Sequence, residues 1–274
     1  MPRFSANLSF LFQEWAPEAR FVAAREAGFK GVELPFPYDI GLGKLGDLLA
    51  MNGLQLAAFN APAGDWEAGE RGLAALPGRE EEFFDGLERA FDLADFVDAK
   101  RVHVMAGLIP EKADFDEVYD TYVDNLTQAA KEARKRGLTV MIEPVSHAAI
   151  PGYMLETPDQ ALAVIADVDD RGLGLMFDVF HAQMAQGRLA ETIEAAMGSL
   201  AHVQIAGVPE RAEPDAGEVN YPYLFDLLDA HGYSGWVGLE YRPRLGTLAG
   251  LRWARSWGIM PEGPTAPGKG KSAP

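Results

Sequence analysis

The chain has 274 residues, of which 48% are hydrophobic and 24% charged, and this is typical of a folded globular protein large enough for one α/β barrel. Its formal net charge of −17 would repel a phosphate backbone and an anionic lipid surface alike, so neither nucleic acid nor a membrane is an expected partner. Cysteine is absent, so no disulfide can form and any metal held by the protein must bind oxygen or nitrogen ligands, which favours hard divalent ions.

The N-terminal stretch MPRFSANLSFLF lacks the long apolar segment and the small-residue cleavage site of a signal peptide. No later run approaches the length that a membrane-spanning helix needs. We therefore expect a cytoplasmic protein.

Short β-rich runs alternate along the chain with longer segments of helical periodicity. We predict strands over residues 4–10, 31–34, 54–60, 101–105, 138–143, 173–178, 201–206 and 236–241. We predict helices over residues 17–27, 79–97, 117–135, 158–166, 190–197 and 223–231. Glycines stand where helices should end before the next strand, at Gly28, Gly53, Gly137 and Gly232.

Eight strands, each followed by a helix or a loop, predict an α/β fold of the (β/α)8 TIM-barrel type. No linker interrupts the pattern, so we expect residues 1–260 to form a single catalytic domain. A doubly wound open sheet is the alternative architecture. The final stretch, PEGPTAPGKGKSAP, is expected to be a flexible C-terminal tail over residues 261–274.

In such a barrel the reactive groups lie at the carboxyl ends of the strands. The polar residues at these ends are Asn7, Glu33, Asn60, His103, Glu143, Asp178, Gln204 and Glu240. Counting in twos along the last four strands places one oxygen-bearing side chain of each on a common face, which we take as the barrel interior. Each of these residues alone could instead cap the helix that follows it.

Three of the four converging side chains are carboxylates, which repel one another unless a proton or a cation lies between them. A divalent cation is the simplest solution, because carboxylate and amide oxygens are ligands that such ions prefer. We therefore predict a site for Mg²⁺ or Mn²⁺ whose ligands are Glu143, Asp178, Gln204 and Glu240.

Many separate segments of the chain resemble the hydroxypyruvate isomerase family, which includes the 2-oxo-tetronate isomerases and belongs to the xylose isomerase-like barrels. These segments, in chain order, are MPRFSANLSFLFQEW, FNAPAGDWEAGERGLAALPGRE, RVHVMAG, IEPVS, FDVFHAQ, HVQIAGVPERAEPDAGEVNYPYLF and GYSGWVGLEYRP. The resemblance extends to about Trp257 and implies a metal-dependent barrel enzyme that isomerises a small hydroxy-oxo acid. It assigns the metal to the same four residues and the acid and base roles to Glu143 and Glu240.

The implied reaction moves a carbonyl group between neighbouring carbons, as between hydroxypyruvate and tartronate semialdehyde. One glutamate would remove a proton from one carbon, and the other would supply or accept the proton at the neighbouring carbon. The ion would stabilise the negative charge of the enediolate. His181 and Arg211 are candidates for binding the substrate carboxylate. The alternatives are a histidine bonded at the start of a helix and a solvated arginine paired with Glu210 or Glu213. His103 and His202 are expected inside the barrel, where a histidine usually serves packing.

Residues 61–77 are too long for an ordinary turn between a strand and a helix. We expect a lid that keeps water away from the enediolate, or else a loop that packs against a neighbouring subunit. A homo-oligomer is therefore left open.

The chain departs from the family pattern at two places. After IEP, where hydroxypyruvate isomerases commonly have an Asn-Thr-Arg type of run, it has Val145, Ser146 and His147. Ala212 stands where a histidine is expected. His147 could compensate or could be exposed to solvent. These departures leave hydroxypyruvate and the four-carbon 2-oxo-tetronate both open as substrates.

Three other functions use the same barrel. A sugar or keto-sugar epimerase could also use two glutamates that face one carbon. A nuclease-like relative would need a histidine-rich zinc cluster and a basic groove, which five histidines and a charge of −17 disfavour. A noncatalytic protein that binds small acids would have no use for two bases.

Overall fold

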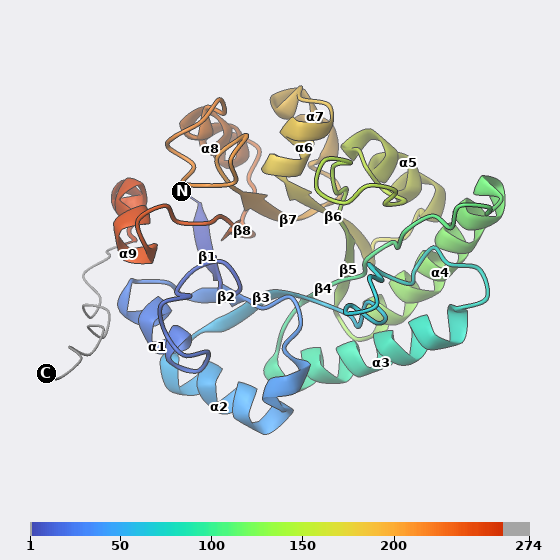
Figure 1. The fold of residues 1–274 in the computed structure, drawn as a ribbon, viewed down its shortest axis with the longest axis horizontal. Coiled ribbons are helices and arrows are strands. Elements are labelled where there is room, and N and C mark those ends of the chain that lie inside the picture. Colours follow the sequence, from blue (N-terminus) through green and yellow to red (C-terminus); the bar gives the residue numbers. More distant parts are fainter. Residues whose placement is uncertain (1, 260–274) are drawn as a thin grey trace, which may run out of the picture.

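The computed structural model describes residues 2–259, which form a closed barrel of eight parallel strands (Figure 1). Each strand pairs with the next, and β8 pairs with β1. The strands are β1 (Arg3–Asn7), β2 (Gly31–Glu33), β3 (Gln55–Asn60), β4 (Arg101–His103), β5 (Thr139–Ile142), β6 (Leu173–Asp178), β7 (Leu200–Ile205) and β8 (Trp236–Leu239). This closure confirms the predicted (β/α)8 fold, and the doubly wound alternative is wrong. The predicted tail at 261–274 lies outside the described residues.

Helices surround the strands on the outside of the barrel (Figure 1). They are α1 (Ala19–Glu26), α2 (Leu42–Asn52), α3 (Glu80–Val97), α4 (Phe115–Lys135), α5 (Pro158–Val168), α6 (Val179–Ala185), α7 (Leu189–Ala196), α8 (Tyr221–Ala230) and α9 (Thr247–Gly250), with 3-10 helices η1 (Tyr38–Ile40) and η2 (Arg252–Trp257). No helix within residues 2–259 combines the length and the apolar character needed to cross a bilayer.

All six helices that were predicted with bounds are present. For α2 only the end at Gly53 was predicted, and α6, α9 and the two 3-10 helices were not predicted. The sequence of α2, LGKLGDLLAMN, contains two glycines that lower its intrinsic helix propensity. Its stability comes instead from burial of Leu45 and Leu49 against the core. The predicted stop after it is confirmed, because Gly53 has φ 59° in the left-handed region where a side chain is disfavoured.

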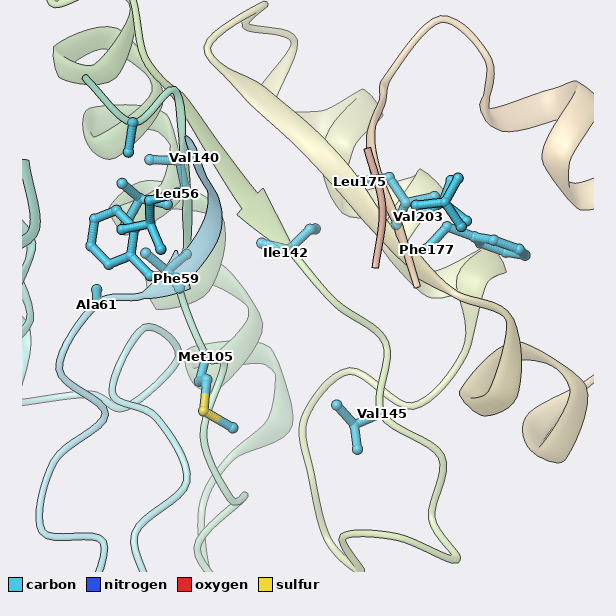
Figure 2. Packing of buried hydrophobic residues seen from close by; sticks show 14 of the residues in the cluster. Leu56, Phe59, Ala61, Met105, Val140, Ile142, Val145, Leu175, Phe177 and Val203 are labelled. Carbon is cyan, nitrogen blue, oxygen red and sulfur yellow. The ribbon is translucent and has the colours of Figure 1, made fainter. Parts of the chain in front are cut away.

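Alternation along the strands separates an apolar outer face from an inner face that carries both apolar and polar side chains. Leu175 and Phe177 of β6 gather with Val203 of β7 in the main hydrophobic core (Figure 2). The intervening Met176 instead belongs to a small cluster with Ala58 and Met141, residues of β3 and β5. Side chains two residues apart along a strand share a face. Glu143 and Asp178, two residues after Met141 and Met176, therefore face the barrel interior.

We expect Gly172→Ala to destabilise the protein, because a Cβ at this position would lie 2.0 Å from the carbonyl oxygen of Ala130 in α4. Overpacking of this kind costs about 1–3 kcal/mol. Gly198→Ala is the matched control, since a Cβ there meets no atom within 4 Å among the described residues. Urea unfolding of both variants measures the difference. Equal midpoints for the two would contradict the close contact between α4 and the start of β6.

Candidate active site

A cavity of about 510 Å³ opens at the carboxyl ends of the strands. Its lining includes His103, Glu143, His181, Arg211, Glu240 and Arg242. A smaller pocket of about 40 Å³ also has Glu143 and Glu240 in its lining, together with Glu33 and Gln204. Glu143 directly follows β5 and Glu240 directly follows β8, so these two glutamates reach the same space from separate strands.

Glu143, Asp178 and His181 form a buried group whose ligand atoms all lie within 4.8 Å of one another, and this group could hold a metal ion. Two of its members are predicted metal ligands, whereas His181 was expected to bind substrate. Gln204 lies in the adjacent pocket, and its Oε1 is buried without a hydrogen-bond partner among the described residues. A buried carbonyl oxygen without a donor is what a hard cation would satisfy, so the set of donors fits a divalent ion.

Asp178 uses its two carboxylate oxygens for different purposes. Oδ1 accepts a hydrogen bond of 2.8 Å from the backbone N–H of Phe180 and caps α6. Oδ2 lies 3.2 Å from Arg211 Nη2 and 3.6 Å from His181 Nε2. The capping alternative therefore applies to one oxygen, and the other remains available to the site.

Arg211 lies within the site, where it faces two carboxylates. Its Nη2 is 3.2 Å from Asp178 Oδ2 and 3.4 Å from Glu240 Oε1. Its backbone has φ 52°, an unusual conformation for a residue with a side chain. The alternative of a solvated arginine paired with Glu210 or Glu213 is wrong, because the Arg211 side chain is 16% exposed and its ion pairs are with Asp178 and Glu240.

His181 is buried in the first turn of α6, and its two ring nitrogens have different neighbours. Nδ1 lies 3.1 Å from Ser146 Oγ, and Nε2 lies 3.3 Å from Arg211 Nη1. Burial lowers the pKa of His181 to about 4, so its ring is neutral at neutral pH. Ser146, one of the residues that depart from the family pattern, therefore orients a site residue. His147 is exposed and bonds to Glu156 at 2.8 Å, so it does not replace the missing arginine.

The electrostatics of the two glutamates are governed by burial. Burial raises the pKa of Glu143 well above its ordinary value, and repulsion by Glu240 and Asp178 raises it further. Burial also raises the pKa of Glu240 to about 8, with attraction by Arg211 opposing the rise. Carboxyl groups with pKa values near or above neutrality can both accept and return protons. A nearby cation would favour their charged forms.

The polar interior continues below these residues. His103 is buried, with Nδ1 3.1 Å from Asn60 Oδ1 and 3.9 Å from Glu143 Oε2. Burial, together with repulsion by His202, lowers the pKa of His103 to about 3. His202 lies against the buried carboxylate of Glu33, with 2.9 Å between Nε2 and Oε1. Glu33 was predicted to be one of the polar strand ends but was assigned no role. Its partners lie on other strands, so the spacing of nearby residues could not predict them.

The segment 61–77 borders the cavity through Trp66 and Arg71. The Arg71 guanidinium lies 3.9 Å from the centre of the Trp66 ring, and Phe36 packs against the same ring with centroids 5.3 Å apart. Leu73 and Ala74 are buried in the core. The second half of the segment is thus anchored in the core, whereas Trp66 in the first half borders the cavity.

The family profile described as a xylose isomerase-like TIM barrel matches residues 21–257. A 2-oxo-tetronate isomerase of Cupriavidus necator is 49% identical over 257 residues, which cover 94% of this chain and 99% of that protein. A hydroxypyruvate isomerase of Escherichia coli is 44% identical over 253 residues, covering 92% of this chain and 98% of that protein.

Solved structures agree with this likeness. A crystal structure of an AP endonuclease, family 2, from Brucella melitensis has a TM-score of 0.92 and 43% identity, covering 94% of this chain and 99% of that chain. A 3-keto-D-glucoside 4-epimerase from E. coli has a TM-score of 0.77 at 21% identity, covering 93% of this chain and 100% of that chain, and shows a shared fold alone.

We expect Arg211→Ala to lower the free energy of unfolding of the protein without added metal by about 3 kcal/mol, because it leaves Asp178 and Glu240 buried without their cation. Arg244→Ala is the control. Arg244 pairs with Glu210 at the surface, where its side chain is 45% exposed against 16% for Arg211, so its loss should cost much less than the loss of Arg211. Denaturant unfolding in EDTA measures both changes, and an equal cost for the two variants would contradict the buried ion pair.

Proposed function

The chain belongs to the hydroxypyruvate isomerase family, within the xylose isomerase-like TIM barrels, and from that premise we propose that it is a metal-dependent isomerase of a small hydroxy-oxo acid. The observation that carries the proposal is that two glutamates, the buried Glu143 and the largely buried Glu240, line one cavity beside further oxygen and nitrogen donors. The substrate is hydroxypyruvate or 2-oxo-tetronate, since the relatives bear both names.

Glu143, Asp178, Gln204 and Glu240 would hold the ion, with His181 close to the first two. Bound there, Mg²⁺ or Mn²⁺ would act as a Lewis acid that stabilises negative charge on the substrate oxygens. The mixture of carboxylate and amide oxygens supports a hard cation.

The two glutamates move the protons of the reaction. One carboxylate removes the proton from the carbon that bears the hydroxyl group, and a proton is returned to the neighbouring carbon that had carried the carbonyl. The hydroxyl proton passes to the former carbonyl oxygen, so atoms and charge balance. The positions of Glu143 and Glu240 support this role, because two carboxylates that line one cavity can act on neighbouring carbons of the same substrate.

Arginine and histidine side chains around the cavity suit the carboxylate of the substrate, the arginines by charge and the neutral histidine by hydrogen bonding. Arg211 and His181 remain the proposed binding residues, and Arg71 and Arg242 add positive charge to the same lining. This cluster contrasts with the net charge of −17 of the whole chain. Trp66 and Arg71 would close over the bound acid if residues 61–77 act as a lid that excludes water.

Nuclease activity has less support than isomerisation, although the Brucella structure is of an AP endonuclease, family 2. The candidate metal group contains one histidine rather than a histidine-rich cluster. The net charge would also repel a nucleic acid backbone.

We expect Glu143→Gln and Glu240→Gln each to lower kcat by about 10²-fold or more, because an amide cannot accept the proton. Both variants should keep the circular dichroism spectrum of the wild type. Glu191→Gln is a matched control on the surface of α7, where Glu191 pairs with Arg188. Steady-state kinetics on hydroxypyruvate and 2-oxo-tetronate measure the effect, and unchanged turnover in both site variants would refute the acid and base roles.

Removal of the metal should abolish turnover, and Mg²⁺ or Mn²⁺ should restore it on a three-carbon or a four-carbon substrate. Assays in deuterated water with product analysis then separate two reactions. An isomerase relocates the carbonyl, whereas an epimerase returns the same functional groups with inverted configuration at one carbon. Full activity in protein shown by elemental analysis to be free of metal would contradict metal dependence.

A further inference from the structure

A buried carboxylate that the proposed reaction does not use lines the smaller pocket of the site. Glu33, at the end of β2, is 2% exposed. Its Oε1 accepts a hydrogen bond of 2.5 Å from Ser5 Oγ and lies 2.9 Å from His202 Nε2. Its Oε2 accepts a hydrogen bond of 2.9 Å from Gln204 Nε2. The carboxylate thus connects β2 with β1 and β7 across the barrel interior.

The space for this carboxylate is provided by the absence of a side chain in β8. A Cβ built on Gly238 would lie 2.0 Å from Glu33 Oε1 and 2.7 Å from its Cδ. In the strand register Gly238 stands opposite both Ser5 and Gln204. The position of Glu33 is therefore set by three neighbouring strands and not by a flexible loop.

The contacts around Glu33 suit a hydrogen-bond acceptor. Ser5 Oγ donates to Oε1, His202 Nε2 lies against the same oxygen, and Gln204 Nε2 donates to Oε2. Because a carboxylate oxygen accepts hydrogen bonds, the Gln204 atom that faces it is the amide nitrogen.

The orientation of the Gln204 amide follows from this contact. With Nε2 held by Glu33, Oε1 points away, and Oε1 is buried without a hydrogen-bond partner among residues 2–259. Glu143 and Glu240 line the same pocket as Gln204. A rotation of the amide by a half turn would present its N–H groups, which repel a cation, in place of the oxygen.

We propose that Glu33 is a positioning residue that fixes the Gln204 amide with its carbonyl oxygen directed at the divalent ion. This inference rests on the proposed function, because it assumes that Gln204 is a ligand. Groups that orient metal ligands in this way typically change metal affinity by about 10–100-fold when they are replaced. Glu33 acts through Gln204 and has no contact with the substrate in this role.

The test is a double-mutant cycle with Mn²⁺ affinity as its readout, measured by electron paramagnetic resonance titration without substrate. Glu33→Gln removes the charge that selects the amide nitrogen, and we expect the Kd for Mn²⁺ to rise about tenfold or more. Gln204→Ala should weaken binding by itself. In the Gln204→Ala background, Glu33→Gln should then cause less than about a twofold further change, because the residue through which Glu33 acts is gone.

Two further variants keep the test decisive. Glu33→Asp retains the charge but shortens the side chain by one methylene, which moves the carboxylate away from Gln204. If Glu33→Gln does not fold, Glu33→Asp takes its place in the cycle. Ser5→Ala removes a hydrogen bond to Oε1 that does not involve Gln204, so the Kd should change less than about threefold. Circular dichroism checks that each variant is folded.

Several results would overturn the inference. One is an undiminished affinity in Glu33→Gln, and another is an equal loss from Glu33→Gln with and without Gln204, which would indicate a direct electrostatic effect. A loss in Ser5→Ala as large as that in Glu33→Gln would indicate general disturbance of the barrel. Failure of the wild type to bind Mn²⁺ would refute the proposed metal site itself and is recognised before any variant is compared.

Discussion

The burial of four carboxylates close to one another is the constraint that governs this site. Glu33, Glu143, Asp178 and Glu240 all lie at the carboxyl end of the barrel, where little water can screen them. The protein supplies partial compensation of three kinds. Arg211 faces two of the carboxylates, His202 lies against Glu33, and backbone and amide N–H groups donate to others. The raised pKa values of Glu143 and Glu240 indicate that this compensation is incomplete.

Parallel strands make such a concentration of charge possible. Every strand ends at the same rim, so residues distant in sequence meet there, close to the buried apolar cluster of Ala58, Met141 and Met176. Small residues are as necessary as charged ones, because the Glu33 carboxylate occupies the space that a side chain at Gly238 would fill. A divalent ion would complete the balance of charge and would also provide the chemistry for moving a carbonyl group.

Much of this could be predicted from the sequence, since it depends on local periodicity. The two-residue alternation correctly placed Met176 in the interior of the barrel. The predicted polar strand ends included all four carboxylates of the site, which are Glu33, Glu143, Asp178 and Glu240. For helix α2 only the end at Gly53 was predicted. Its two glycines lower the local helix propensity, and tertiary burial of Leu45 and Leu49 overrides this.

The remaining features depend on contacts that no local pattern encodes. The left-handed backbone of Arg211 directs a loop arginine between two carboxylates, and neighbouring acidic residues in the sequence suggested a surface pair instead. The bonds of Glu33 to residues 28, 169 and 171 positions away arise from barrel closure. Ser146 became meaningful only when the fold brought it beside His181.

The most direct test of the central claim is a crystal structure of the Mn²⁺-loaded protein, with the ion located by its anomalous scattering. We predict one strong peak at bonding distance from a carboxylate oxygen of Glu143, Asp178 and Glu240 and from Oε1 of Gln204. A peak held by Glu143, Asp178 and His181 without Gln204 and Glu240, or an ion bound outside the barrel mouth, would contradict it.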